Sequence, residues 1–506
     1  MNKPQSLSLG FKLGLLFIFA LSLYIQFHLY LNWDSTWLLE ASSRLLAGGD
    51  YHTRFVDPNT PLIIYLGIIP VLMTKLTGLS IEWSMRLFTY LIALASMALC
   101  SELLKILLPK DSNSRSLFLI GLALGFLVLT NTDFGQREHL MVMLILPYAV
   151  LRSSEELNGI RLKILVGLLA GIGFALKPQF LIPFVIMELC RLRRVKKIKL
   201  LFTPDLITII AIFFIYLAAT IHFNPEYFSF TFPLTTIFYS RFPHASTEAL
   251  LYNSDAQVIL ITLVLSRVTT FPESKVLTTL QKNLIDLNLI FLGLYLLQGL
   301  AWQYHLLPSL VCSLLLLILN FQAFMQKNKF SFLLSFVIVG IAMLLKITVV
   351  STLNGIYNKT QPKSPINQII AAVNELHPHY YMVWTTTVNP TPILMNYTTA
   401  KLASRFSGMW LVPAIHQQSL EPSNPKNESQ LKWRKKLLYK IVIDDILQFK
   451  PEVILVDVSD EKAYLKGRFD YIEFFNEDPQ FRKIWGSYKF KKRVLNFDLY
   501  QRSQGT

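Results

Sequence analysis

The stretch SLFLIGLALGFLVLTNTDFGQREHLMVMLILPYAVL, Ser116 to Leu151, decides the fold class of this chain. Two apolar runs, 116–132 and 138–151, enclose a short polar turn. Such runs are typical of helices that enter a bilayer, and ionisable residues at their ends must be solvated, paired or functional. The stretch therefore predicts a membrane protein with a charged turn that needs an explanation. The ionisable residues of the turn are Asp133, Arg137, Glu138 and His139.

The composition of the whole chain agrees with a membrane protein. It has 506 residues, of which 53% are hydrophobic and 16% charged, whereas soluble proteins average about 25% charged residues. The net charge of +16 fits Lys and Arg in cytoplasmic loops and beside lipid headgroups, so a nucleic-acid partner is discounted. The three cysteines lie in apolar segments and lack the spacing of a disulfide framework or a metal site.

The hydropathy pattern predicts a polytopic all-α membrane protein with about eleven transmembrane helices. Lys and Arg gather in alternate loops, and because such residues near helix ends stay in the cytoplasm, we expect a cytoplasmic N-terminus. The turn at 133–139 then lies on the outer side, with the loops 32–60 and 223–254 and the segment 302–305. The predicted spans are 11–31, 82–108, 116–132, 138–151, 162–177, 179–190, 203–222, 255–271, 284–300, 305–325 and 331–350.

Two further helices are predicted to lie at the membrane interface. The segment 35–47 is amphipathic, and the segment 61–79 carries prolines and glycines that suit the interface better than a full span. Residues 1–350 thus form the expected transmembrane domain.

From about residue 351 the composition changes to that of a small α/β domain. YYMVWTT and PEVILVDV read as buried strands, 366–378 as an amphipathic helix and VLNFDLYQR as a final strand. Asp478 is the expected cap of a helix with Pro479 at its first position. We expect an extracytoplasmic domain over 351–506, with a polar linker at 417–430.

Asp34 follows the first apolar run directly. It either caps the helix 35–47 by accepting backbone N–H bonds or acts in chemistry, and the residues alone favour neither. Arg54 and Asp57 follow in the same loop, where Asp57 opens a turn signal with Pro58 and Asn59. These two residues either pair with each other or contact a substrate.

The opening turn contains the start of a helix. Asp133 is predicted to cap a helix that begins at Phe134, with Gln136 reaching back as in a capping box. Glu138 in the first turn suits the helix dipole, whereas Arg137 does not. The residues left to contact a ligand are Arg137, Glu138 and His139, with Asp133 as a further candidate.

Two more polar sites are predicted on the same outer face. Lys177 ends a span just before a proline, where it either extends to the interface or binds a ligand. Tyr304 fits an aromatic belt, and His305 beside it does not. Transfer of a sugar from a lipid phosphate needs a carboxylate base, cations for the departing phosphate and an apolar groove. Asp34 would be the base, and Arg137, Lys177 and His305 would hold the phosphate.

The order of these segments resembles the membrane glycosyltransferases of the GT-C type. The similar group is that of the bacterial relatives of protein O-mannosyltransferases and of the lipid A aminoarabinose transferase. The matching features are Asp34 past the first helix, LLAGGDYHTRFVDPNTPLIIYL, the cluster DFGQREHL and the late YHLLP. The resemblance covers roughly residues 11–350.

The resemblance implies an inverting hexosyl or pentosyl transferase with Asp34 as general base. It implies a polyprenyl-phosphate sugar as donor and an envelope lipid, glycan or protein as acceptor, at the outer face of a bacterial inner membrane. Asp133, Arg137 or Glu138 would contact donor or acceptor. Protein O-mannosyltransferases carry adjacent Asp and Glu in the first outer loop, whereas Ser35 follows Asp34 here. No DxD-type motif is present in this loop, so neither a metal nor another cofactor is predicted.

Two other classes of protein compete with the enzyme hypothesis. A transporter or flippase of lipid-linked sugars places its charges near the bilayer midplane, often between inverted repeats. Here the charges gather at one predicted face, and no repeat is visible. A membrane-anchored binding scaffold would leave the outer charges without a role. We therefore favour the glycosyltransferase.

Overall fold

A computed structural model describes residues 8–155, 157, 159–269, 271, 274–326, 332–422 and 424–503. The described residues pack into two compact units. The predicted domain boundary at 350 follows the chain, whereas each unit gathers several separate segments. The first unit holds described residues within Met1–Asn32, Thr60–Ala219 and His244–Ile356, and the second those within Trp33–Asn59, Thr220–Pro243 and Tyr357–Thr506.

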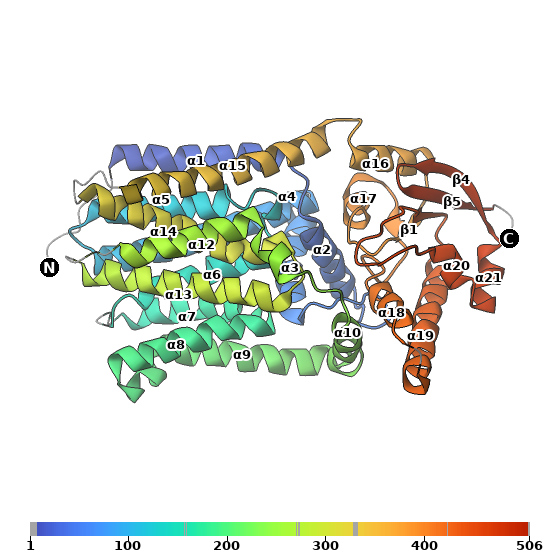
Figure 1. The fold of residues 1–506 in the computed structure, drawn as a ribbon, viewed down its shortest axis with the longest axis horizontal. Helices are drawn as coiled ribbons and strands as arrows, with labels where there is room; N and C mark the ends of the chain where they lie inside the picture. The colour runs from blue at the N-terminus through green and yellow to red at the C-terminus, as the bar shows by residue number, and fades with distance from the viewer. Residues whose placement is uncertain are drawn as a thin grey trace. The chain divides into compact units, whose positions relative to one another are not determined.

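The first unit is a bundle of helices, and Figure 1 shows its long members running side by side. The helices that lie wholly or mostly in it are α1 (Leu9–Phe27), α3 (Pro61–Thr77), α4 (Ile81–Leu107), α5 (Ser112–Leu127), η1 (Asn131–Asp133), α6 (Arg137–Leu151), α7 (Ile160–Ala175), η2 (Pro178–Phe180), α8 (Leu181–Val195), η3 (Ile198–Phe202), α9 (Pro204–Phe223), α11 (Thr247–Leu251), α12 (Ser254–Val268), α13 (Lys275–Gln298), η5 (Gln303–Leu306), α14 (Leu307–Gln326) and α15 (Phe332–Thr360).

Among the described residues, six helices are long and apolar enough to cross a membrane: α1, α4, α9, α13, α14 and α15. Their surfaces keep large apolar side chains exposed, such as Phe17 (68%) and Phe214 (68%), as helices facing lipid do. Helices α5, α6, α7, α8 and α12 match predicted spans but have only 15 or 16 residues, short of the ~20 that a perpendicular span needs. The chain is a polytopic, mostly helical membrane protein, and the count of eleven spans stays a prediction.

Helix α6 is the core of the first unit. All of its residues are buried, and it packs against α4, α7, α13 and α14. The contact with α7 depends on Gly173, because a Cβ there would lie 2.8 Å from Ile145 Cγ2. A helix buried on all sides places any charge at its two ends in a low-dielectric environment, where unpaired charges are costly.

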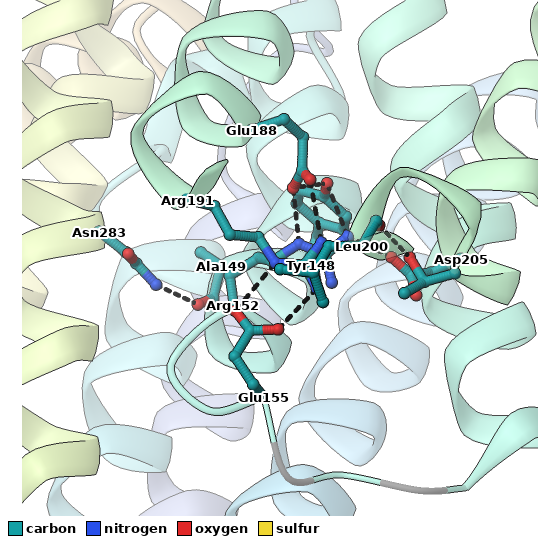
Figure 2. Close-up of polar contacts among 10 residues, drawn as sticks. Tyr148, Ala149, Arg152, Glu155, Glu188, Arg191, Leu200, Asp205 and Asn283 are labelled. Atoms are coloured by element: carbon teal, nitrogen blue, oxygen red, sulfur yellow. Dashed lines mark hydrogen bonds and ion pairs between the residues drawn. The ribbon is translucent and has the colours of Figure 1, made fainter. Parts of the chain in front are cut away.

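The C-terminal end of α6 is tied to α8 and α9 by a buried ionic network, shown in Figure 2. Arg152 donates to Glu188 at 2.6 Å and also to Asp205. Arg191 donates to Glu188 at 3.0 Å and forms two hydrogen bonds, of 2.9 and 2.6 Å, with Glu155. Two buried guanidinium groups thus face the two buried carboxylates of Glu188 and Asp205, and the more exposed carboxylate of Glu155 adds a further negative charge.

The second unit contains a five-stranded sheet in the order β2-β1-β3-β5-β4. Strand β1 pairs in parallel with β2 and β3, and β5 is antiparallel to β3 and β4. The elements of this unit are α2 (Trp33–Leu46), η4 (Tyr227–Thr231), α10 (Phe232–Tyr239), α16 (Pro365–Glu375), β1 (Tyr380–Trp384), α17 (Thr391–Tyr397), β2 (Lys401–Leu402), α18 (Val412–Ser419), α19 (Pro425–Phe449), β3 (Val453–Asp457), α20 (Tyr471–Phe475), α21 (Pro479–Trp485), β4 (Tyr488–Val494) and β5 (Phe497–Arg502).

Helices cover both faces of this sheet. Met382, Trp384, Ile454 and Val456 pack on α18, α19, α20 and α21 in one apolar core. On the opposite face, the Tyr381 hydroxyl donates to the backbone oxygen of Thr391 in α17 at 2.8 Å. The sequence pattern predicted the strands β1, β3 and β5 correctly because each is a short apolar or alternating run.

Local capping signals explain where several helices begin. Asp478 accepts backbone N–H bonds from Gln480 at 2.8 Å and Phe481 at 3.2 Å, as predicted for α21. The predicted linker 417–430 is wrong in part, since α19 starts inside it at Pro425. Asn424 caps that helix through the N–H of Asn427 at 2.9 Å, and a proline at the first helical position supports the start.

Candidate functional site

The N-terminal end of α6 begins differently from the sequence prediction. The helix starts at Arg137 with Gln136 as its N-cap, and the Gln136 side chain accepts the Glu138 N–H at 2.7 Å. The capping box predicted at Asp133 is therefore wrong. Gly135 interrupts the chain with φ +82°, a left-handed conformation that suits glycine, and Asp133 falls in the preceding 3₁₀ turn.

Glu138 is the centre of a buried charged cluster. Lys177 donates to its Oε1 atom. Arg137 Nη2 lies 3.6 Å and His305 Nε2 3.8 Å from the same oxygen. The side chains of Glu138 and His305 are each only 2% exposed. Arg137 of α6, Lys177 between α7 and η2, and His305 of η5 thus surround one carboxylate. We call these three residues and Glu138 the Glu138 cluster.

The hydrogen bonds of the Glu138 cluster are incomplete. Among the residues that the structure describes, Glu138 Oε2, Arg137 Nε and His305 Nδ1 are buried without a hydrogen-bond partner. Buried polar atoms in native proteins are bonded in about 90% of cases, so such exceptions need an explanation. Two fixed cations and a histidine share one carboxylate, which leaves the cluster suited to a further anion.

Aromatic rings line the cluster beside Lys177. Its Nζ atom lies 5.7 Å from the ring centroid of Tyr304 and 5.6 Å from that of Phe180. The Trp302 and Tyr304 rings stack at 5.8 Å. The sequence pattern indicated Tyr304 as a candidate but neither Phe180 nor Trp302. Trp302 lies two residues before Tyr304 in the sequence, and this closeness was the available signal.

His139 and Asp133 make contacts that belong to the turn before α6. His139 is fully buried, its Nδ1 accepts the Gly135 N–H at 3.0 Å, and its ring lies 5.3 Å from that of Phe134. Asp133 accepts a hydrogen bond from Asn32 at 3.1 Å, which ties the turn to the chain after α1. These contacts give both residues a structural role in the turn.

The remaining predicted residues belong to the second unit. Helix α2 begins at Trp33, so Asp34 lies inside its first turn, half-buried, rather than preceding a helix at 35. Asp57 is buried and accepts hydrogen bonds from Trp37 at 2.5 Å and from the Asn59 N–H at 2.8 Å. Arg54 is exposed. The turn predicted at Asp57 is present, and a substrate role for Arg54 and Asp57 stays a prediction.

No group of three or more His, Cys, Asp or Glu able to hold a metal ion is found among the described residues. The expectation that no metal is required stays a prediction.

Comparison with protein-family models finds no match, and comparison with curated proteins finds none either. Solved structures do match. The structure of ArnT from Cupriavidus metallidurans bound to undecaprenyl phosphate aligns with a TM-score of 0.54 and 11% identity, over 97% of this chain and 98% of that chain. The apo structure of the same ArnT gives the same TM-score and identity, over 96% and 97%.

These neighbours are a lipid A aminoarabinose transferase of the GT-C type. At 11% identity the likeness concerns the fold, and it extends over nearly the whole of both chains. The chain therefore has the ArnT-like fold that the order of its segments predicted.

Proposed function

We propose that this protein transfers a sugar from a polyprenyl-phosphate donor to an envelope acceptor, at the outer face of a bacterial inner membrane. The observation that carries the proposal is the Glu138 cluster, in which Arg137, Lys177 and His305 are buried around a single carboxylate oxygen. The ArnT-like fold supports it, because one ArnT structure has undecaprenyl phosphate bound.

The chemistry of the transfer explains why cations are needed. The bond between the anomeric carbon and the phosphate oxygen breaks, and the phosphate leaves with the electron pair. Charge therefore grows on the phosphate in the transition state, where prearranged cations stabilise it most in a site that excludes water. Arg137 and Lys177 would bind this phosphate, and His305 would donate a further hydrogen bond.

Glu138 has a separate role in this proposal. Two cations without a counterion would repel each other in a buried site, so the carboxylate holds Arg137 and Lys177 together before the donor binds. Its Oε2 atom, buried and without a partner among the described residues, leaves a position for a donor hydroxyl group. Tyr304 and Phe180 would shield the phosphate from water.

Asp34 is the general base of the proposed reaction. Its carboxylate would accept the proton of the acceptor hydroxyl as the acceptor oxygen attacks the anomeric carbon. Attack opposite to the departing phosphate inverts the configuration at that carbon. The acceptor is a lipid, glycan or protein of the envelope, and the transferred sugar is a hexose or a pentose.

The proposal is tested by analysing envelope glycolipids and glycans from cells that lack the protein or carry one of four forms. The forms are wild type, Asp34→Asn, Lys177→Gln and the control Lys105→Gln, which changes an exposed lysine (39%) of the first unit. We expect one glycoform to be missing without the protein and with Asp34→Asn or Lys177→Gln, and to be retained with Lys105→Gln.

A transporter would give a different result in vitro. Purified protein in detergent, mixed with an extract of polyprenyl-phosphate sugars and with envelope lipids from the deletion strain, should restore the missing glycoform. A protein that only moves lipid-linked sugars across a bilayer produces no transfer in micelles, and that outcome would exclude the enzyme. Full retention of the glycoform by Asp34→Asn would remove Asp34 as the base.

A further inference from the structure

The sheet of the second unit contains a topological switch point between β1 and β3. The two strands are adjacent and parallel. The connection after β1 runs through α17, whose Thr391 contacts Tyr381 on one face. The connection after β3 leads to α20 and α21, whose Phe475 and Phe481 pack against Trp384 on the other face. Strands whose connections leave to opposite faces open a crevice at their carboxyl ends, where α/β sheets commonly bind ligands.

Polar side chains gather at these carboxyl ends. Thr385, directly after β1, donates to Asp457 Oδ2 at 3.2 Å. Ser459 donates to Asp457 Oδ1 through its hydroxyl at 2.6 Å and its backbone N–H at 3.0 Å. Lys462 donates to the Ser459 backbone oxygen at 2.6 Å and is only 7% exposed. Burial lowers the pKa of Lys462. Asp457 itself stays half-exposed, so a ligand can reach its carboxylate.

Two buried polar atoms near this point lack a hydrogen-bond partner among the described residues. These atoms are Asn389 Oδ1 and Thr391 Oγ1. Both lie in the chain that follows β1, where the Thr387 hydroxyl is 3.2 Å from that of Thr385 and donates to the Asn389 backbone oxygen at 2.7 Å. Because buried polar atoms are nearly always bonded, these atoms indicate that water or a ligand completes the arrangement.

The charges indicate what kind of ligand fits. Asp457 ends β3, and the loop after it carries Asp460 and Glu461 beside Lys462, so an anion such as a phosphate would meet more negative than positive charge. A carboxylate, hydroxyls and an amide together can bind groups that both donate and accept hydrogen bonds. Sugar hydroxyls have that property. Tyr464 in the same loop adds an aromatic ring, a common wall of small-molecule sites.

We propose that the switch point between β1 and β3 is a binding site for an uncharged saccharide. Asp457 and Thr385 bind its hydroxyl groups, and Asn389 Oδ1, which lacks a hydrogen-bond partner among the described residues, completes the contacts. The inference concerns binding in the second unit alone. It does not depend on the proposed transfer reaction, because no turnover is needed to observe it.

The test uses the full-length protein in lipid nanodiscs and saturation-transfer NMR. The probes are the methyl glycosides of glucose, galactose, mannose, rhamnose, arabinose and N-acetylglucosamine, and inorganic phosphate. We expect wild type and the control Glu473→Gln, an exposed carboxylate on α20, to transfer saturation to at least one glycoside. Asp457→Asn should weaken that binding about tenfold, because a hydrogen bond to a charged group is lost.

A second variant protects the test against misfolding. Thr385→Val keeps the shape of the side chain and removes only its hydroxyl, so it should weaken the same glycoside while the unfolding temperature stays near that of wild type. The proposal is overturned if no glycoside binds wild type. It is also overturned if both Asp457→Asn and Thr385→Val bind the glycoside as wild type does, or if phosphate alone binds at Asp457.

Discussion

The two ends of α6 carry buried ionic clusters of opposite design. At the C-terminal end, Arg152 and Arg191 meet three carboxylates (Figure 2), and among the described residues of that network Asp205 Oδ1 is the buried side-chain atom without a partner. At the N-terminal end, Arg137, Lys177 and His305 meet the single carboxylate of Glu138, and three atoms of the cluster have no hydrogen-bond partner within the part of the chain that the structure describes. The ends are about 22 Å apart at 1.5 Å per residue.

The difference teaches how to separate a structural cluster from a binding site when both are buried and charged. At the C-terminal end the buried charges balance, since two guanidinium groups face the Glu188 and Asp205 carboxylates, and the hydrogen bonds are nearly complete, so no further ligand is needed. A buried cluster with excess positive charge and unpaired polar atoms lowers the stability of the fold until an anion binds to it. Burial and the presence of charge alone would make the two ends of α6 equally good candidates for a binding site.

The largest expected effect is at the C-terminal end of α6. Arg152→Met leaves Glu188 and Asp205 buried beside an apolar side chain, and breaking such a pair typically costs about 3–5 kcal/mol in the free energy of unfolding. Denaturant unfolding in detergent measures this loss. The variant that remains folded should bind undecaprenyl phosphate as wild type does. A loss below about 1 kcal/mol, the range of exposed pairs, would show that this end does not hold the fold together.

The next largest effect concerns the affinity for undecaprenyl phosphate at the N-terminal end of α6. Lys177→Gln removes a charge-assisted bond to the donor phosphate, worth about 1.5–3 kcal/mol, or roughly a 10- to 150-fold loss of affinity. Native mass spectrometry with undecaprenyl phosphate measures this affinity. Lys177→Gln should destabilise the fold less than Arg152→Met, because Arg137 and His305 remain beside Glu138. Unchanged affinity would contradict a phosphate-binding role for the cluster.

A third variant makes the two ends respond differently to an anion. Glu138→Gln leaves the cations of its cluster without a counterion, so inorganic phosphate should occupy the site and raise the stability by about 1.4 kcal/mol at tenfold the dissociation constant. The matched variant is Glu188→Gln, where Asp205 and Glu155 still neutralise the arginines. Thermal unfolding with and without phosphate gives both results. An equal response of the two variants would remove the distinction between the ends.

The sequence allowed much of the fold to be predicted because helix-forming runs and strand patterns are local. Each predicted span corresponds to a helix, and β1, β3 and β5 lie where expected. The start of α6 was misplaced because the pattern at Asp133 resembles a capping box. Gly135 separates that pattern from the helix through its left-handed backbone conformation, which the sequence pattern does not show. The division into units could not be read locally, because each unit joins segments distant in the chain.

The candidate site residues were predicted less accurately than the fold. Arg137, Glu138, Lys177 and His305 were all named, and the structure brings them together. His139 was named with them, yet its ring serves the turn at Gly135, since neighbours on a helix point in different directions. Lys and Arg near the ends of predicted spans were interpreted as loop cations, yet Arg152, directly after the span 138–151, is buried and paired. Sequence shows the charge of a residue, whereas its partner depends on packing.

The smallest expected effect tests whether burial explains how much the ion pairs at the two ends of α6 contribute to the free energy of unfolding. Lys105 pairs with Glu102 at 2.5 Å, closely enough to resemble the pairs of the Arg152 network, but the side chains are 39% and 57% exposed. Water screens such a pair, so Lys105→Gln should change the free energy of unfolding by no more than about 0.5 kcal/mol and leave the affinity for undecaprenyl phosphate unchanged. The residual effect should shrink further at high salt, whereas the loss in Arg152→Met should persist, because buried charges are screened little. A loss in Lys105→Gln as large as that in Arg152→Met would mean that ion-pair geometry, and not burial, sets the energy, and the contrast between the ends of α6 would then need another cause.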